Sequence, residues 1–320
     1  NVWDYDTNKF YQFYSPKPIS FTKNTEIDII EGIKTRLSDA VKKRMMADRE
    51  VGSLLSGGLD SSLISALVNK YSNGKLKTFS IGLPDSVDLQ YASLVSKHLE
   101  TNHFNIEISA HIFLNSIEKV IYKIESYDTT TVRASVGNYL VSKYIRENSD
   151  CKVIFNGDGS DEVCGGYLYM RDAPSPKAFQ KECEKLVSEL YYFDVLRSDR
   201  SISSNGLEPR TPFLDKEFVR YYLSIPAERK IFDGDEIIEK RLLRKAFDVE
   251  MLLPESVLWR RKCAFSDGVS EITNSWHHKI QDFVESKISD SEFTNESRRI
   301  FHCTPLTKES YYYRKIFNSF

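Results

Sequence analysis

The stretch of sequence that decides the fold is VGSLLSGGLDSS, at residues 51–62. Its first part, Val51–Leu55, is a short apolar run typical of a buried strand, and residues 61–70 have the pattern of a helix. A pair of glycines lies between the two. Because the amino end of a helix presents unpaired N–H groups, this strand–turn–helix arrangement predicts an anion site at the turn.

The turn itself contains the residue types that bind a phosphate chain together with magnesium. Its glycines let the backbone approach a phosphate closely, and its serine hydroxyls add donors. Asp60 would be repelled by bare phosphate, so a bridging Mg²⁺ accounts for its presence. No lysine follows the glycines, which excludes the GxxxxGK[ST] loop. The alternative is an ordinary strand-to-helix turn capped by Ser and Asp, and the two flanks disfavour it.

Strand-like and helix-like runs alternate along the first half of the chain. Besides residues 51–55, the strand-like runs are 78–83, 103–108 and 152–155; the helix-like ones are 25–46, 61–70, 89–100, 112–125 and 135–148. Such alternation predicts an α/β fold with a parallel sheet flanked by helices. After Pro176 the strand patterns fade, so we expect a mainly helical C-terminal part.

A second glycine-rich turn, NGDGSDE at residues 156–162, follows the strand-like run 152–155. Ligands of open α/β sheets bind at the carboxyl ends of the strands, so this turn is interpreted as a second lip of the same cleft. Taken alone, it could equally be a solvated acidic turn.

Composition limits the classes of partner. Lys and Arg total 44 against 46 Asp and Glu, which predicts no binding to nucleic acid or to an anionic membrane. No apolar run approaches the length that spans a bilayer. The five cysteines show neither metal-site spacing nor a disulfide framework, so we expect reduced thiols in a cytoplasmic protein.

The run SGGLDSS resembles the pyrophosphate-binding loop of the ATP pyrophosphatases. Segments 127–135, 156–169, 206–215 and 259–268 resemble the matching segments of the glutamine-hydrolysing asparagine synthetases, in the same order, from about Val51 to Phe317. This resemblance implies a Rossmann-like ATP pyrophosphatase core at about 48–170 and a mainly helical part at about 171–320, within a synthetase domain of residues 21–320.

Residues 1–20 resemble the end of the family's N-terminal glutaminase domain followed by a linker. Residues 2–14 have a hairpin pattern, and Ser15–Pro18 breaks it. The chain begins with Asn1, so we expect a piece of a longer protein. The family's glutaminase nucleophile is an N-terminal cysteine, and no cysteine precedes Cys151. These residues are therefore not expected to hydrolyse glutamine by that route.

The resemblance also implies roles for individual residues. An ATP site would be formed by Leu54, Ser56, Gly57, Gly58, Asp60, Ser61, Ser62, Ile81, Asn156 and Gly157, of which Leu54, Ile81, Asn156 and Gly157 would line the adenosine pocket. Asp60 and Asp161 correspond to Mg²⁺ ligands. Thr130, Thr131 and Arg133 would bind aspartate and phosphate. Lys262 would offset charge on the α-phosphate, and Asp158, Lys262 and Arg133 would be the catalytic residues.

The implied reaction has two steps and uses ATP and Mg²⁺. The side-chain carboxylate of aspartate attacks the α-phosphorus of ATP, giving β-aspartyl-AMP and pyrophosphate. Ammonia, supplied from glutamine by the glutaminase domain of the same native chain, then displaces AMP to form asparagine. The family also implies a homodimer.

Two positions depart from the family pattern, which usually has Ser at residue 156 and Glu at residue 158. Displacing a catalytic group by about 1 Å can cost roughly a hundredfold in rate, so the shorter Asp158 implies either a shifted backbone or a slow enzyme. Two alternatives stay open: an adenylating cyclase similar to the β-lactam synthetases, and a weakly active or non-catalytic paralogue. Asp158 and segment 130–133 favour the ammonia-using branch.

Overall fold

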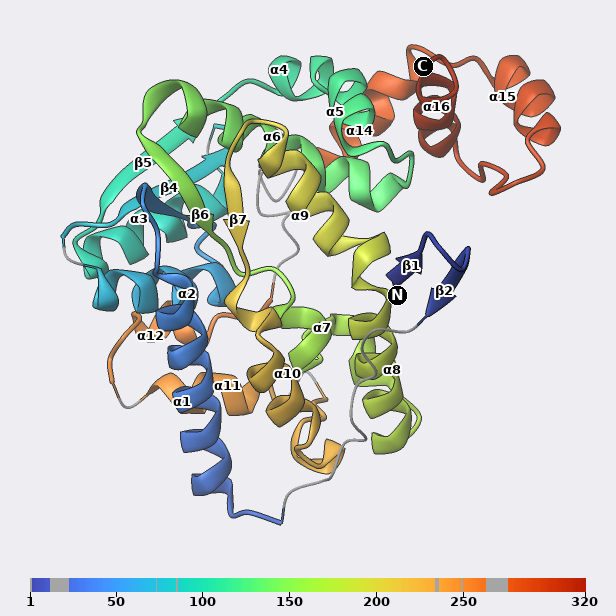
Figure 1. The fold of residues 1–320 in the computed structure, drawn as a ribbon. Coiled ribbons are helices and arrows are strands. Elements are labelled where there is room, and N and C mark those ends of the chain that lie inside the picture. Colours follow the sequence, from blue (N-terminus) through green and yellow to red (C-terminus); the bar gives the residue numbers. More distant parts are fainter. Residues whose placement is uncertain are drawn as a thin grey trace.

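A five-stranded sheet forms the centre of the molecule (Figure 1). The computed structural model describes residues 2–11, 23–72, 74–84, 86–233, 236–248, 250–262 and 276–320. The strands of the sheet are β3 (Glu50–Leu54), β4 (Lys77–Gly82), β5 (Asn102–Glu107), β6 (Cys151–Phe155) and β7 (Glu208–Arg210). All neighbouring strands are parallel, and this confirms the predicted fold class.

The order of the strands fixes where a ligand can bind. In space they run β5-β4-β3-β6-β7, so the chain moves from β3 to one side of the sheet and then returns to its other side at β6. A crevice forms at the carboxyl ends of the strands where the direction of winding reverses. The loops after β3 and β6 lie on either side of that point, and they are the two glycine-rich turns.

Helices cover both faces of the sheet (Figure 1). In the first half of the chain they are α1 (Glu26–Arg44), α2 (Leu59–Tyr71), α3 (Val87–Leu99), α4 (Ala110–Asn115), α5 (Ile117–Ile124), α6 (Thr129–Asn148) and α7 (Ser160–Cys164). Later come α8 (Pro176–Glu189), α9 (Asp194–Ser203), α10 (Lys216–Leu223), α11 (Arg241–Asp248), α12 (Glu255–Leu258), α14 (Trp276–Glu285), α15 (Asp290–Glu296) and α16 (Lys308–Phe317).

Successive side chains of β6 point alternately into two apolar cores, one on each face of the sheet. Val153 and Phe155 face the core that contains Leu63 and Leu67 of α2. Ile154 points the other way, into the core of α4, α5 and α6. This period of two is what a strand buried on both faces requires, and it accounts for the continuous apolar character of the run.

Three elements differ from the sequence-based prediction. The helix expected over 112–125 is two helices, which meet at Ser116. The helix expected from residue 135 begins at Thr129, because the Asp128 side chain accepts a hydrogen bond from the N–H of Thr131 and caps it. β7 was not predicted. It contains Pro209 and lies at the edge of the sheet, where a proline is tolerated.

The two ends of the chain form separate features. β1 (Val2–Asp4) and β2 (Lys9–Tyr11) pair in an antiparallel hairpin, as predicted, with the rings of Trp3 and Phe10 4.6 Å apart. The expected linker at 15–18 lies outside the described residues. At the other end, α14 and α16 pack beside α4, α5 and α6 in a C-terminal lobe (Figure 1).

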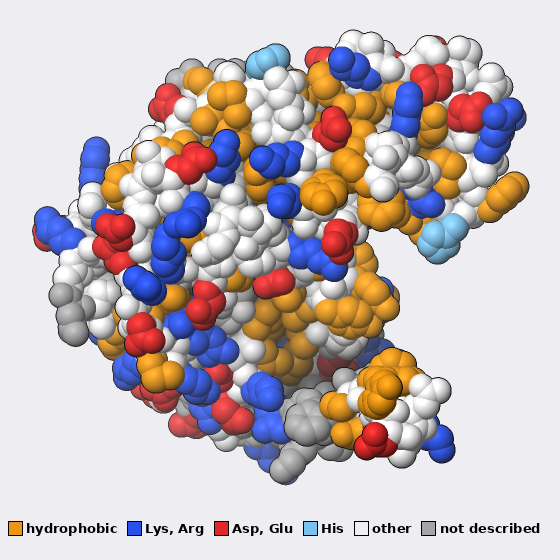
Figure 2. Space-filling view, turned by 45° about the horizontal axis from the view of Figure 1, so that its top comes forward, with side chains coloured by type: hydrophobic (Ala, Val, Ile, Leu, Met, Phe, Trp, Pro, Cys, Tyr) orange, Lys and Arg blue, Asp and Glu red, His pale blue; other side chains and the backbone are white. Residues whose placement is uncertain are grey.

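The molecular surface carries charges of both signs, and the cysteines that the structure describes are free thiols. On the face drawn in Figure 2, basic and acidic side chains are intermixed. Cys151, Cys164, Cys183 and Cys303 are free thiols, the first three of them buried, while Cys263 lies outside the described residues. In the part of the chain that the structure describes, no helix is long and apolar enough to cross a membrane.

Partial burial of His103 on β5 makes stability depend on pH. Its ring lies 3.0 Å from the Thr78 hydroxyl and 3.2 Å from that of Ser80, and burial lowers its pKa to about 4. Between about pH 6.5 and 4 the unfolded chain binds a proton that the folded chain does not. We therefore expect the free energy of unfolding to fall as pH decreases through this window, by at most about 3 kcal/mol from this group.

Urea unfolding at a series of pH values measures this effect. His103→Gln keeps polar atoms near both hydroxyls but does not titrate, so its stability should fall less steeply than wild type between pH 6.5 and 4. Equal slopes would contradict a neutral, half-buried His103 in the folded state.

Candidate active site

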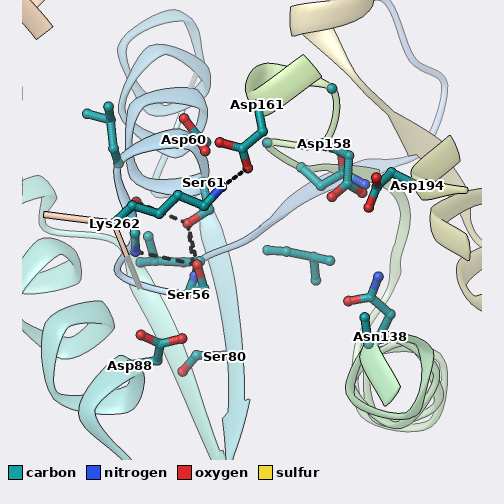
Figure 3. A pocket seen from close by; sticks show the side chains of 18 of the residues that line it. Ser56, Asp60, Ser61, Ser80, Asp88, Asn138, Asp158, Asp161, Asp194 and Lys262 are labelled. Carbon is teal, nitrogen blue, oxygen red and sulfur yellow. Dashed lines mark hydrogen bonds and ion pairs between the residues drawn. The ribbon is translucent and has the colours of Figure 1, made fainter. Parts of the chain in front are cut away.

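A cavity of about 410 Å³ opens at the carboxyl ends of β3, β4 and β6. Both glycine-rich turns border it, as the sequence predicted. Leu54, Ser56, Gly58, Asp60, Ser61, Ile81, Thr130, Arg133, Asn156, Gly157, Asp158, Asp161 and Lys262, all named as candidates from the sequence, line it. Figure 3 shows Asp60, Asp161 and Lys262 close together near Ser61 and Ser56, with Asn138 on another side of the cavity.

The first turn leaves the amino end of α2 available to a ligand. Gly58 is the N-cap residue, and no side chain caps the helix. The hydroxyls of Ser56 and Ser61 lie 2.9 Å apart, and the Ser56 N–H donates to Ser61 Oγ at 3.1 Å. The two hydroxyls are therefore held beside the uncapped N–H groups, which is the arrangement that binds an anion.

Glycines in these turns are required by geometry. Gly57 has φ of +76°, and a Cβ atom there would lie 2.5 Å from the backbone nitrogen of Ala92. In the second turn, a Cβ atom at Gly157 would lie 2.7 Å from the backbone nitrogen of Ser61. Any larger residue at 157 would push the second turn away from the start of α2, so glycine lets the two lips of the cavity meet.

Two carboxylates and two lysines converge next to the start of α2. Lys240 Nζ lies 2.6 Å from Asp60 Oδ2 and 2.6 Å from Asp161 Oδ1, and Lys262 pairs with the other oxygen of Asp161 (Figure 3). Burial opposes ionisation of Asp161, but the two ammonium groups outweigh it and lower its pKa. Burial likewise opposes the charge of Lys240, yet Asp161 and Asp60 raise its pKa. Asp161 and Lys240 are therefore both charged at neutral pH.

The residues present suit a magnesium ion that is held together with a phosphate chain. Asp60 and Asp161 lie on two sides of one ammonium nitrogen, and each carboxylate oxygen has a further lone pair to offer. Mg²⁺ is bound by one or two carboxylates plus phosphates and water, not by an all-protein cage. The described residues contain no cluster of three or more His, Cys, Asp or Glu side chains that could hold a metal ion.

Asp158 is fixed by a network that joins the second turn to α9. Asn156 Oδ1 accepts the N–H of Asp158 at 3.2 Å, and Asn156 Nδ2 donates to Ser198 Oγ at 2.8 Å. Arg197 lies 3.5 Å from the Asp158 carboxylate. Burial raises the pKa of Asp158, opposed by the Arg197 charge and a hydrogen bond from Ser198. Asn156 thus has a defined structural role.

Two further acidic side chains, Glu162 and Asp194, lie close to Asp158 and are linked to it through Tyr167 and Arg197. The Tyr167 hydroxyl is 2.5 Å from Glu162 and 3.1 Å from Asp194, and Arg197 pairs with Asp194 at 2.6 Å. Burial and the nearby Asp194 carboxylate raise the pKa of Glu162 to about 8. Glu162 is therefore mostly protonated at neutral pH, while the charge of Arg197 is shared between Asp158 and Asp194.

Arg260 fastens the Lys262 segment to the first turn. Its guanidinium donates to the Gly57 carbonyl and to Asp88, both at 3.2 Å, and stacks 3.9 Å from the centre of the Tyr91 ring. Lys262 follows two residues later, so this contact brings its ammonium to the cavity. The rest of the matched segment, residues 263–268, lies outside the described residues.

Arg133 is held by the C-terminal lobe. Its guanidinium bonds through two nitrogens to Glu309 of α16, at 2.6 Å for Nε, and the Tyr313 hydroxyl donates to the same carboxylate at 2.9 Å. Glu309 is 4% exposed. A helix that is remote in sequence therefore fixes the direction of a side chain that lines the cavity.

Glu309→Ala is expected to destabilise the fold by about 2–3 kcal/mol, because Arg133 loses its buried carboxylate partner and Tyr313 loses its acceptor. The free energy of urea unfolding measures this. Lys315→Ala on the same helix is the matched control: its pair with Glu292 is exposed and should contribute at most about 1 kcal/mol. An equal loss of unfolding free energy in the two variants would show that the Arg133–Glu309 contact stabilises the fold no more than an exposed ion pair does.

Three candidates from the sequence lie behind the cavity wall. Ser62 is fully buried in α2, and Thr131 is 4% exposed in the first turn of α6. Gly57 shapes the loop through its positive φ and its carbonyl. None of the three is among the residues that line the cavity. Seven further residues line the cavity without having been named as candidates: Lys240, Arg197, Asp194, Glu162, Asn138, Arg260 and Asp88. Glu162 lies in the second glycine-rich turn and Arg260 in the matched segment 259–268, whereas no such turn or matched segment marks Lys240, Arg197, Asp194 or Asp88.

Comparison with known proteins identifies the family. A family model described as asparagine synthase matches residues 32–182 and 171–320. This chain belongs to the asparagine synthase family. Asparagine synthetase [glutamine-hydrolyzing] of Rattus norvegicus is 49% identical over 298 residues, which are 90% of this chain and 53% of the relative's length. The Homo sapiens protein of the same name is 47% identical over 297 residues, with the same two coverages.

This member of the asparagine synthase family spans about half the length of the curated relatives it matches. Among solved structures, NMN synthetase from Francisella tularensis covers 89% of the chain and 100% of its own, at 14% identity and a TM-score of 0.39. The family assignment rests on the sequence matches alone.

Proposed function

We propose that this chain is the synthetase part of an asparagine-forming ligase. It would activate the side-chain carboxylate of aspartate with ATP as β-aspartyl-AMP, release pyrophosphate, and transfer the acyl group to ammonia. The observation that carries the proposal is the convergence of Asp60, Asp161, Lys240 and Lys262 at the uncapped start of α2, in a chain of the asparagine synthase family.

The charged end of the cavity suits the leaving pyrophosphate. Backbone N–H groups at the start of α2 and the hydroxyls of Ser56 and Ser61 would bind its oxygens. Asp60 and Asp161 would hold Mg²⁺, which would neutralise the phosphate charge when bound. Lys262 would then stand beside the α-phosphate and stabilise the charge that develops during attack. The hydroxyls of Ser56 and Ser61 already lie together beside the N–H groups of α2, 2.9 Å apart.

The opposite end suits the adenosine and the amino acid. Leu54 and Ile81 give the cavity an apolar wall, and Asn156 and Gly157 border it. Arg133, held by Glu309, and Thr130 would bind aspartate and phosphate. Thr131 lies behind this wall and would act by supporting it. Holding both substrates in one orientation contributes to the rate of such a reaction, together with the charge stabilisation at the phosphate end.

Asp158 is our candidate for managing the proton of the incoming ammonia. Burial raises its pKa, while Arg197 and Ser198 keep its carboxylate in place. A carboxylate with a raised pKa is a better proton acceptor at neutral pH than an exposed one. The hydrogen bonds of Asn156 with Ser198 and with the N–H of Asp158 support the second turn beside this carboxylate.

Features beyond these residues remain proposals. The relatives are about twice as long, which supports an N-terminal glutaminase domain that supplies ammonia in the native protein. A homodimer and a cytoplasmic location are likewise expectations from the family. The first alternative, a β-lactam synthetase-like cyclase, would require an internal amine in place of ammonia.

Product analysis tests the proposal. The purified chain with ATP, Mg²⁺, aspartate and an ammonium salt should form AMP, pyrophosphate and asparagine in equal amounts. Other carboxylic acids in place of aspartate should form none of them. AMP release with a different acid would favour the cyclase, and absence of AMP and pyrophosphate with every acid would favour a non-catalytic paralogue.

A further inference from the structure

Asn138 of α6 is a buried polar side chain for which the sequence suggested no role. It lines the cavity and is 9% exposed. Among the described residues its amide has no hydrogen-bond partner, and Figure 3 shows it pointing from α6 into the cavity. Its polar atoms are not among the buried atoms that lack a partner, so they face the open cavity. The amide is therefore free to bond a ligand.

The surroundings of Asn138 differ from those of the phosphate end. Along α6, Thr130, Arg133, Ala134, Asn138 and Val141 share the face toward the cavity, as the helical repeat of three and four residues requires. Asn138 thus lies between Ala134 and Val141, beyond the charge of Arg133.

Opposite this part of α6 is an apolar wall. The helix packs against β4, whose Phe79 and Ile81 share one core with Val141, and Leu54 packs on the same core. A slot with apolar sides and the Asn138 amide is suited to a heterocycle that has a polar edge. A carboxylate or phosphate would instead require a positive charge, and Asn138 carries none.

We propose that Asn138 determines nucleotide specificity by hydrogen-bonding with the polar edge of the purine base of ATP. This inference rests on the proposed function, since it places ATP in the cavity. An asparagine amide offers a donor beside an acceptor, which matches the amino group and ring nitrogen of adenine. Guanine presents two acceptors at the corresponding edge, so the amide fits it less well.

The test measures nucleotide binding without requiring turnover. Mg-ATP and Mg-GTP are titrated calorimetrically into the wild type, Asn138→Leu and Asn138→Ala. Leu is close to Asn in size but lacks the amide, and Ala leaves the slot open. We expect ATP to bind the variants about tenfold more weakly, and the preference for ATP over GTP to fall by a similar factor. Asn148→Leu, at the exposed end of the same helix, is the control and should bind like wild type.

Kinetics provides a second readout. The KM for ATP should rise about tenfold in Asn138→Leu while kcat and the KM for aspartate stay near wild type, as for loss of a uniform binding contact. If wild type binds ATP but the variants bind it equally well with the same base preference, the role of Asn138 is wrong. A change in the KM for aspartate alone would also overturn it. Failure of the wild type to bind ATP would instead overturn the proposed function.

Discussion

Asp161→Asn is expected to lower aspartate-dependent ATP–pyrophosphate exchange about a thousandfold, because one neutral amide replaces the carboxylate shared by Lys240, Lys262 and the proposed Mg²⁺. The loss has two causes. The metal loses one of its two protein ligands, and both ammonium groups lose the anion that fixes their direction. Exchange of labelled pyrophosphate into ATP measures the first half-reaction alone, so ammonia does not enter the result.

Asp215→Asn is the matched control for that experiment. Asp215 is also a buried carboxylate between two cations, 2.8 Å from both Lys43 and Arg44, and their hydrogen bonds outweigh burial and lower its pKa to about 2. It is not among the residues that line the cavity. Its variant should lose stability but retain exchange per folded molecule. If both variants lose exchange equally, the effect is one of folding, and the role of Asp161 is contradicted.

Asp158→Asn is expected to reduce asparagine formation by roughly a hundredfold to ten thousandfold, the range for loss of a proton-transfer group. The amide is isosteric and can still accept from Ser198, so the fold should be unchanged. It cannot accept a proton, and it removes one of the two carboxylates that share Arg197. Rates of asparagine and pyrophosphate formation, measured together, show which half-reaction depends on the carboxylate.

Asp158→Glu supplies the comparison for charge and length. It keeps the carboxylate, so it should retain more activity than Asp158→Asn even though the longer side chain must fit between Arg197 and Ser198. Pyrophosphate and asparagine formation at wild-type rates in Asp158→Asn would remove this residue from the mechanism.

Local sequence patterns predicted the two glycine-rich turns of the site, because each turn is formed by one short continuous segment. The turn at 56–62 and the turn at 156–162 each follow a strand of the parallel sheet, so their meeting follows from topology. The candidates Asp60 and Asp161 came from these turns, and the structure brings both to one ammonium group.

Residues that reach the site from distant segments escaped prediction. Lys240 precedes a basic helix and carries no motif, yet it pairs with an aspartate 180 residues away. Glu309 approaches Arg133 across 176 residues for the same reason. β7 has only three residues, one of them a proline, and forms a strand only because β6 offers it an edge. Such contacts depend on tertiary packing, which local propensity does not report.

The most direct test of the account is a crystal structure of the chain soaked with Mg²⁺, aspartate and the α,β-methylene analogue of ATP. We expect the β- and γ-phosphates at the start of α2, against Ser56 and Ser61, with a metal ion bound by Asp60 and Asp161 and the base against Leu54 and Ile81. A structure with the nucleotide elsewhere, or with phosphates in place but both carboxylates directed away from any metal, would contradict it.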